Sequence, residues 1–445
     1  MSVEEALRAL LRFAANEAIA AVQPARCLHR SVALERDVLS IGEQIIDLAA
    51  VDRILVVGMG KASATTAAAL ESILGARITE GLVITADGYR VPTDRIEVRE
   101  ARHPIPDARG LAAAQRLASI VQDAREDDLV LVLISGGGSS LLCLPQPPVT
   151  LDDLVETHAQ LLRSGLPIYS VNVVRKHLSL LKGGGLAELA HPARVVSLIL
   201  SDVPGDRLDV IASGPTVPDP STFADAVRLL CEASLWERLP STVRHVLESG
   251  ARGDRTDTLK PDAPAMERVA NVLIGSGRAA GEVAQRVGGE HGFHARLLSC
   301  TLRGEARIVG GALASIARRL RSSAPPFPLP AWLVATGETT VTVTGHGRGG
   351  RNQEVALSAA QGIAGLDGIV IGAVGTDGRD GPTDAAGGLV DGGTSARLRH
   401  AGIDIGRALA DNASHDALAA SGDLLLTGPT GTNVADLVLL VVSAG

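Results

Sequence analysis

The chain has 445 residues, of which 46% are hydrophobic and 21% charged, and its formal net charge is −8. This length exceeds the roughly 250–300 residues that one core usually supports, so we expect two domains, and no segment has the composition of a disordered region. The acidic balance and the absence of a basic run argue against a nucleic-acid-binding surface.

The amino terminus predicts an amphipathic helix and no targeting signal, because Glu4 and Glu5 stand where a signal peptide carries positive charge. No apolar stretch approaches the ~20 residues that span a bilayer, so we expect no membrane segment. The cysteines are scattered, with neither a C-x-x-C pair nor metal-ligand spacing to His, which argues against disulfides and zinc. These features predict a cytoplasmic protein.

Apolar runs and amphipathic segments alternate along the chain. Continuous apolar runs are typical of strands buried on both faces and occur at 53–58, 81–86, 129–135, 194–201, 269–275, 331–336, 368–374 and 436–442. Ala-rich amphipathic segments predict helices over 61–75, 108–125, 151–164, 221–234, 278–288, 304–321 and 352–364. Thr150 and Ser221 are predicted N-caps. This alternation predicts an α/β fold with a mostly parallel sheet.

Two breaks in this pattern are candidate domain boundaries. Charged residues and Pro replace periodic apolarity over 252–266, and a second Pro-rich break covers 322–330. Elements of the same kind flank the second break, so we interpret it as a loop, with the linker as the alternative. We therefore expect one domain over 1–260 and another over 261–445.

Five predicted strands end directly in glycine-rich turns, of which the first begins at Gly58 and the second at Gly136. Glycine lets backbone N–H groups approach an anion, and ligands bind at the carboxyl ends of strands in open α/β sheets. The first two turns supply the predicted phosphate-binding residues, which are Gly58, Gly60, Gly136, Gly137, Gly138, Ser139 and Ser140. A single turn of this kind would be weak evidence, because glycine also serves tight turns without a ligand.

Lysine is rare in this chain, which makes its positions informative. Only Lys61, Lys176, Lys182 and Lys260 occur among 42 basic residues. Lys61 follows Gly60 and Lys182 precedes three glycines, so both are predicted phosphate ligands, since an ammonium and a guanidinium are not interchangeable at a tight site. The turn at Lys61 is not a Walker A motif, because Leu55 holds the first glycine position and Ala62 follows the lysine.

Later loops add further charged candidates. Arg351 follows a glycine run and opens a helix, so the segment predicts an anion clamp. The next loop holds Asp377, Asp380 and Asp384 among glycines, which suits Mg²⁺, although Asx-turns alone explain one or two of these residues. The predicted substrate-binding residues also lie at or near strand ends or basic motifs, and they are Arg175, Asp202, Glu338 and Asn352.

The motifs together resemble a known family. The segments GMGKAS, HPIPD, ISGGGSSLL, VRKHLSLLKGGGLA, LSDVPGD, IASGPTVPDPST, TGETTVTV, GRGGRNQE, GTDGRDGPTDAAG and TGPTGTNVADL are similar to those of class II glycerate 2-kinases, some of which carry the name putative hydroxypyruvate reductase. The resemblance covers nearly the whole chain. Its departures are Arg379 inside the aspartate loop and the segment 412–418, where the family more often has aromatic residues.

The resemblance implies a reaction and a fold. It implies ATP-dependent phosphorylation of D-glycerate to 2-phosphoglycerate with Mg²⁺, by a Rossmann-like domain joined to a smaller α/β domain with a mixed sheet. Lys61 and Arg351 match the family's proposed catalytic cations. We expect the active site in the interdomain cleft, with Mg²⁺ on Asp377 or Asp384, and we leave open which residue takes the hydroxyl proton.

Two other functions compete with the kinase. One is an NAD(P)H-dependent hydroxypyruvate reductase, against which stands the imperfect dinucleotide fingerprint at Gly58, Gly60 and Ser63. The other is a non-catalytic sensor of a phosphosugar or nucleotide, which would not need so many carboxylates among its glycines. The residues alone do not select the 2-hydroxyl over the 3-hydroxyl. They also leave the oligomeric state open, with a homodimer as one option.

Overall fold

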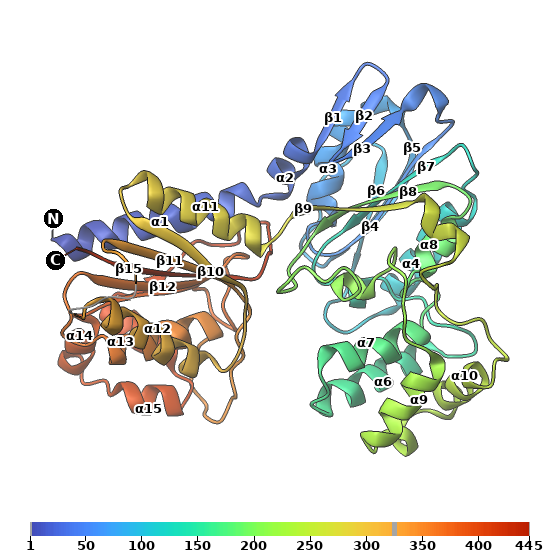
Figure 1. Cartoon of the computed structure of the whole chain (residues 1–445). Coiled ribbons are helices and arrows are strands. Elements are labelled where there is room, and N and C mark those ends of the chain that lie inside the picture. Colours follow the sequence, from blue (N-terminus) through green and yellow to red (C-terminus); the bar gives the residue numbers. More distant parts are fainter. Residues whose placement is uncertain (1, 323–326, 445) are drawn as a thin grey trace. The chain divides into compact units, whose positions relative to one another are not determined.

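The structure is a computed structural model that describes residues 2–322 and 327–444 and divides the chain into two compact units (Figure 1). The first unit consists of Cys27–Ser201 and Arg207–Ile274, and the second of Met1–Arg26, Asp202–Asp206 and Gly275–Gly445. Each is described by itself below. Of the Pro-rich segment 322–330, residues 323–326 lie outside the described residues.

This division differs from the expected boundary at 260/261 for two physical reasons. Strand β9 (Val269–Gly275) adds to the edge of the first unit's sheet, which moves the transition to about residue 274. Helix α1 (Val3–Ala21) packs against α11 (Gly277–Glu290) of the second unit, so the amino terminus belongs there. The amphipathic helix expected at the amino terminus is confirmed, and Ser2 caps it in a capping box with Glu5.

The first unit is built on a six-stranded sheet in the order β6-β5-β4-β7-β8-β9. The four pairs from β6 to β8 are parallel, as the sequence predicts. The other strands of this sheet are β4 (Ile54–Met59), β5 (Ile78–Ala86), β6 (Ile96–Ala101), β7 (Leu129–Ile134) and β8 (Arg194–Leu200). All residues of β4 and β7 are buried, whereas β9 is only partly buried because it lies at the edge.

Some helices of the first unit cover this sheet, and others form a separate cluster that is drawn below it in Figure 1. Helices α3 (Ser63–Leu74) and α4 (Ala108–Gln122) pack on the strands. The cluster has its own apolar core and contains α6 (Leu151–Arg163), α7 (Ile168–His177), α9 (Phe223–Glu232) and α10 (Ser241–Ala251). The remaining elements are α2 (Pro24–Ser31), α5 (Gly138–Leu141), α8 (Gly185–Ala190) and an antiparallel sheet of β1 (Val32–Glu35), β2 (Val38–Ile41) and β3 (Gln44–Asp47).

One of the two predicted N-caps is confirmed and the other is wrong by one residue. Thr150 caps α6 in a capping box with Asp153. Helix α9 is capped by Thr222, whose side chain and Asp225 form a second capping box. The hydroxyl of Ser221 instead donates to the carboxylate of Asp219, which removes it from the helix terminus.

The second unit has a mixed six-stranded sheet in the order β10-β11-β15-β12-β13-β14. Only β10 and β11 pair in parallel, and the other four pairs are antiparallel. A mostly parallel sheet is therefore wrong for this unit, while the mixed sheet implied by the family resemblance is confirmed. The strands are β10 (His294–Leu302), β11 (Ala331–Gly337), β12 (Ile369–Gly375), β13 (Gly387–Asp391), β14 (Leu424–Leu425) and β15 (Asp436–Val442).

Helices on both faces explain why these antiparallel strands are apolar throughout. Figure 1 shows α1 and α11 over one face and α12 (Ala306–Leu320) and α13 (Arg351–Gly362) over the other. Strands covered on both faces bury every residue whatever their direction, and β11, β12 and β15 do so. Smaller helices complete the unit, namely α14 (Thr394–His400), α15 (Ile405–Ala410) and α16 (Ser414–Ser421).

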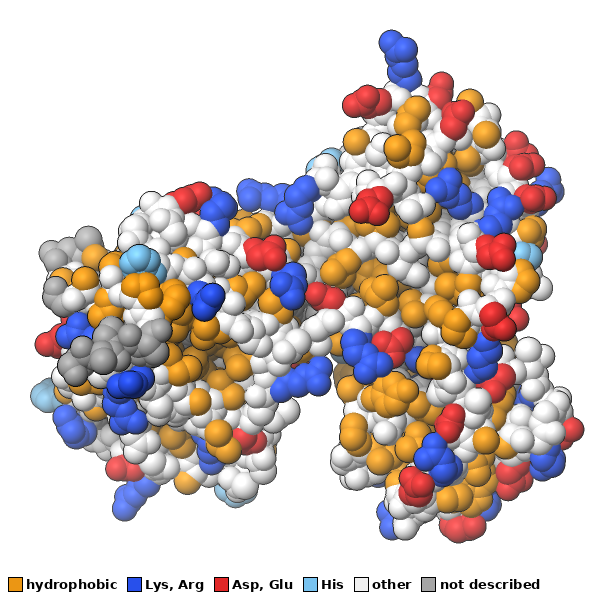
Figure 2. Space-filling model, viewed as in Figure 1, with side chains coloured by type: hydrophobic (Ala, Val, Ile, Leu, Met, Phe, Trp, Pro, Cys, Tyr) orange, Lys and Arg blue, Asp and Glu red, His pale blue; other side chains and the backbone are white. Residues whose placement is uncertain are grey.

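The surface carries charges of both signs. On the face drawn in Figure 2, basic and acidic side chains are interspersed over both units. None of the described helices combines the length and the apolarity needed to cross a bilayer. A binding site for an anion therefore has to be sought in local groups of residues at the strand ends.

Candidate active site

The first two glycine-rich loops meet because their strands are neighbours. Strands β4 and β7 run in parallel side by side, so the loops that follow them start at the same sheet edge. The backbone N–H of Lys61 donates to the carbonyl of Gly136 at 2.9 Å, and the N–H of Ala62 donates to the Ser135 hydroxyl at 3.1 Å. The two turns that supply the predicted phosphate-binding residues are therefore in direct contact.

Glycine is required where the two loops touch. Gly60 has φ +121°, and a Cβ there would collide with Ser135. Gly137 has φ +84°, and its Cβ would lie 3.0 Å from Nε2 of His103 and 3.5 Å from Cγ of Lys61. Glycine therefore brings the two backbones and the Lys61 side chain into close contact.

The amides of the first loop are used within the protein. Gly58 lies inside β4, which pairs on both sides, and the N–H of Gly60 donates to the carbonyl of Ile84 at 3.0 Å. The prediction that Gly58 and Gly60 hold phosphate through their amides is therefore not supported by their contacts. Their contribution is to shape the loop that presents Lys61.

Lys61 differs from the other three lysines in having no partner. Its ammonium forms no hydrogen bond or ion pair within residues 2–322 and 327–444. Each of the others is engaged: the ammonium of Lys176 lies 3.4 Å from Asp219, Lys260 donates to the carbonyl of Ser221, and Lys182 donates to the carbonyl of Leu142. A partly buried ammonium without an acidic neighbour is suited to bind an anion.

Lys182 departs from its predicted role. Its side chain is buried, and its Nζ donates to the carbonyl of Leu142 at 2.7 Å, just after α5. Burial lowers the pKa of Lys182 to about 8. These contacts make Lys182 a support for the Gly136–Ser140 loop and not a ligand of nucleotide phosphates.

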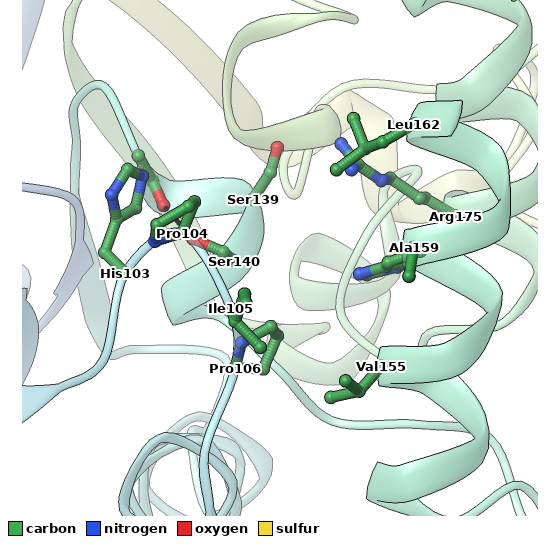
Figure 3. A pocket seen from close by; sticks show the side chains of 12 residues that line it. His103, Pro104, Ile105, Pro106, Ser139, Ser140, Val155, Ala159, Leu162 and Arg175 are labelled. Carbon is green, nitrogen blue, oxygen red and sulfur yellow. Dashed lines mark hydrogen bonds between the residues drawn. The ribbon is translucent and has the colours of Figure 1, made fainter. Parts of the chain in front are cut away.

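A pocket of about 290 Å³ lies beside this loop (Figure 3). One wall is formed by the 103–106 segment and α5, and the other by α6 and α7. Most of the lining is apolar, and its polar groups come from five side chains. The lining residues are His103, Pro104, Ile105, Pro106, Gly137, Ser139, Ser140, Val155, His158, Ala159, Leu162 and Arg175.

The charged and titratable groups at this pocket favour an anionic ligand. No Asp or Glu lines it. Arg175 forms no ion pair or hydrogen bond with any residue that the structure describes, and its Nε is fully buried. Burial, together with the nearby charges of Arg175 and Lys182, holds the pKa of His158 well below its ordinary value, so His158 is neutral.

Ser139 belongs to a hydrogen-bonded chain that reaches α7. Its hydroxyl lies 2.8 Å from the hydroxyl of Ser213, which donates to the amide oxygen of Asn172 at 3.3 Å. Ser213 and Ala212 both have left-handed backbone conformations, with φ of 61° and 50°. Non-glycine residues adopt this conformation only where surrounding contacts enforce it, and such positions cluster at functional sites.

In the second unit, Arg351 is held by two carboxylates. Its Nε and Nη2 donate to Asp436 at 2.6 and 3.0 Å, and its Nη1 donates to Glu338 at 2.6 Å. Burial lowers the pKa of Arg351, but the charges of Asp436 and Glu338 raise it above its ordinary value. Burial raises the pKa of Asp436 to about 6, against the opposing effect of Arg351.

The first turn of α13, which begins at Arg351, already binds a carboxylate of the protein itself. The carboxylate of Asp380 accepts from the backbone N–H groups of Asn352 and Gln353 at 3.1 and 2.8 Å, and from the Gln353 side chain. Asn352 is buried and also donates to Asp436. The anion clamp predicted here is thus occupied by Asp380, and Asn352 is not placed to contact a substrate.

The two predicted magnesium ligands have separate surroundings. Asp377 accepts from the N–H of Arg379 in its own loop, while the exposed Asp384 lies 3.1 Å from Nε2 of His415. No three His, Cys, Asp or Glu side chains gather into a metal site within the described parts of the chain. A magnesium ion that arrives with nucleotide phosphates needs only one or two protein carboxylates, so single residues of this loop fit that role.

The predicted substrate residues are spread over both units. Arg175 lies in the first unit, at the pocket. Asp202 lies in the second unit, where it accepts from the side chain of Asn433 at 3.4 Å, and Glu338 pairs with Arg351. Sequence reasoning missed Asp436, which it treated as the first residue of an apolar strand. One signal could have identified it: a carboxylate stands at the first position of a buried strand, in a chain that also has an arginine predicted to bind an anion.

Comparisons with known proteins agree over nearly the whole chain. A family model described as a domain of unknown function (DUF4147) matches residues 10–248, and the MOFRL family model matches residues 331–436. Glycerate 2-kinase of Pyrococcus horikoshii is 44% identical over 96% of both chains, and a putative hydroxypyruvate reductase of Agrobacterium vitis is 43% identical over 88% of this chain and 87% of its own length.

A solved structure extends the agreement to the fold. The crystal structure of glycerate kinase from Thermotoga maritima superposes with a TM-score of 0.87, at 40% identity, over 98% of this chain and 100% of that one. The two matched family models, the kinase relative and the shared fold lead to one assignment. The chain belongs to the glycerate 2-kinase family.

Proposed function

We propose that this protein is a kinase that transfers the γ-phosphoryl group of ATP to the 2-hydroxyl of D-glycerate and releases ADP and 2-phosphoglycerate. The observation that carries the proposal is the ammonium of Lys61, which has no partner among the described residues and lies where two strand-end loops meet. The names of the relatives support the same reaction.

The reaction forms one bond to phosphorus and breaks another. The glycerate hydroxyl oxygen attacks the γ-phosphorus and loses its proton, and the bond to the bridging oxygen of ADP breaks. Negative charge spreads over the transferred group in the transition state, so catalysis depends on positioning and on fixed positive charge. Mg²⁺ bound to the nucleotide would neutralise part of the phosphate charge, with Asp377 or Asp384 as its protein ligand.

We assign Lys61 to the transferred phosphoryl group. Its ammonium does not have to leave an internal partner when the phosphate arrives, so the binding energy is not spent on breaking an ion pair. The Gly136–Ser140 loop, which lies against the Lys61 backbone, is proposed to receive the neighbouring phosphate oxygens.

Arg351 is proposed as a second cation for the transferred group. Its two-pronged contact with Asp436 fixes the guanidinium plane, since Asp436 is buried. Glu338 is the partner that a phosphoryl oxygen would replace. Its side chain is 45% exposed, and exposed ion pairs contribute only about 0–1 kcal/mol.

The proposal is tested by measuring ADP release from ATP and D-glycerate, with Mg²⁺ present and then removed by a chelator. We expect ADP release that requires both glycerate and Mg²⁺. A second assay follows NADH absorbance on addition of hydroxypyruvate, because some relatives are named after that reduction. NADH oxidation without ADP release would overturn the kinase assignment. Binding of ATP or glycerate without any turnover would indicate a sensor.

A further inference from the structure

The pocket beside Ser139 contains an arginine that no described residue neutralises. Arg175 lies on α7, and no residue among 2–322 and 327–444 forms an ion pair or hydrogen bond with it. Arg351 of the second unit, by contrast, is paired with the carboxylates of Glu338 and Asp436. Leaving a largely buried guanidinium without an acceptor costs free energy, which an anionic ligand would recover.

The opposite wall offers a second donor that is held in place. Figure 3 shows Ser139 and Arg175 on facing sides of the pocket. The Ser139 hydroxyl is 2.8 Å from that of Ser213, which is fully buried and is also bonded to Asn172 on α7. Asn172 and Arg175 are three residues apart on the same helix, so Ser213 connects the two walls.

The size and lining of the pocket distinguish between the two substrates. Its volume of about 290 Å³ lies at the lower limit of the ~300–1,000 Å³ typical of small-molecule sites, which suits a three-carbon acid better than a whole nucleoside triphosphate. Most of its lining is apolar, with Pro104, Pro106 and Leu162 among the lining residues, and a carboxylate–guanidinium contact is stronger in apolar surroundings than in bulk water.

We propose that Arg175 binds the carboxylate of D-glycerate, that the Ser139 hydroxyl is the second donor to it, and that Ser213 is the positioning residue for Ser139. The proposal rests on the proposed glycerate kinase activity. It places D-glycerate, the acceptor of the phosphoryl group, in the pocket beside Ser139. It moves Ser139 from the phosphates of the nucleotide to the acceptor and specifies the substrate group that Arg175 contacts.

The first test replaces Arg175 and compares the Michaelis constants of the two substrates. Arg175→Ala should raise KM for D-glycerate about 10- to 100-fold, the range expected for a lost hydrogen bond to a charged group, and leave KM for ATP within twofold. Arg175→Lys keeps the charge without the planar fork and should lie between. Arg163→Ala, on an exposed arginine of α6, is the matched control and should leave both constants unchanged.

Titration calorimetry with D-glycerate alone provides a readout without turnover. We expect weaker binding in Arg175→Ala by a similar factor, with a melting temperature near that of the wild type. An increase of KM for ATP alone would assign the pocket to the nucleotide and overturn the proposal. So would unchanged glycerate binding in an active Arg175→Ala enzyme. If the wild type forms no ADP with glycerate, the proposed function fails instead.

The second test separates positioning by Ser213 from a general structural role. Ser213→Ala removes the hydroxyl and keeps the left-handed backbone position occupied by a side chain, whereas Ser213→Gly also relieves the backbone strain. Both should raise KM for glycerate severalfold with little change in kcat. In a Ser139→Ala background, Ser213→Ala should add no further increase. Additive effects in the double variant would overturn the positioning role.

Discussion

Two glycine-rich regions of this protein look alike in sequence and differ in how their cations are neutralised. In the first unit, Lys61 and Arg175 have no acidic partner among the residues that the structure describes. In the second unit, Arg351 is paired with Asp436 and Glu338, and the amides at the start of α13 are bound to Asp380.

This difference shows what the shared motif leaves undecided. Glycines, a basic residue and a helix start create an anion site in either case. Whether a ligand or the protein fills it depends on carboxylates that are distant in sequence, such as Asp436, which lies 85 residues from Arg351. The first unit therefore offers free positive charge, and the second offers cations whose orientation is already fixed.

The largest expected effect tests whether Asp380 is a structural anion. Asp380→Ala leaves the backbone N–H groups of Asn352 and Gln353 without the carboxylate that accepts from them, while the Gln353 side chain keeps Thr383 as an acceptor. We expect a loss of at least about 2 kcal/mol in the free energy of unfolding, since each of the two buried unsatisfied donors costs about 1–3 kcal/mol. Urea unfolding measures this loss.

Asp384→Ala in the same loop is the stability control. The Asp384 side chain is 81% exposed, so its replacement should change the unfolding free energy by less than about 0.5 kcal/mol. Equal stability of the two variants would show that Asp380 is not needed to hold the helix start, and the contrast between the two units would then fail.

Lys61→Ala should give the opposite result, a loss of turnover with the fold intact. We expect kcat to fall by ~10² or more, as for removal of one charged contact to the transition state. The unfolding free energy should stay within about 0.5 kcal/mol, because no internal partner is lost. Lys61→Arg serves as the charge-preserving control. Near-normal turnover in Lys61→Ala would remove Lys61 from the chemistry.

The smallest expected effect is a pH dependence of stability at Asp436. Its folded pKa is raised by burial to about 6, above the ordinary value of 3.8, so the native state binds this proton more tightly than the unfolded chain. Stability of the wild type relative to Asp436→Asn should therefore rise as the pH falls from 7 toward 4. Melting temperatures at pH 7 and 5 measure the trend, and a relative loss on acidification would contradict it.

Much of the fold follows from local pattern, and the exceptions have physical causes. All eight apolar runs form strands. Seven of them are buried almost throughout, as continuous apolarity predicts, whereas β9 at a sheet edge is only partly buried. Seven of the described strands lie outside these runs. Two of them, β6 and β10, lie at sheet edges, where Glu97, Arg99 and the alternating exposed residues of β10 interrupt the apolar pattern, and the other five are β1, β2, β3, β13 and β14. The antiparallel direction of β15 could not be predicted either, because an apolar run has the same pattern in a parallel and in an antiparallel strand.

The sequence predicts which types of residue form the candidate site, but it does not predict which other residues each of them contacts. The loops at Lys61 and Gly136–Ser140 meet because β4 and β7 pair in parallel, although β5 and β6 lie between these two strands in sequence. The burial of Lys182, the occupation of the α13 start by Asp380 and the link from Ser139 to Ser213 are tertiary contacts. Each contact joins residues at least 27 positions apart, so no local sequence pattern can predict it.

The most direct test of the proposed reaction identifies the carbon that receives the phosphoryl group. ¹³C-labelled D-glycerate is incubated with ATP, Mg²⁺ and the enzyme, and NMR follows the coupling between phosphorus and carbon in the product. We expect a product with phosphorus attached through the oxygen on carbon 2, formed together with an equal amount of ADP. Phosphorylation on carbon 3, or no phosphorylated product, would contradict the proposed reaction.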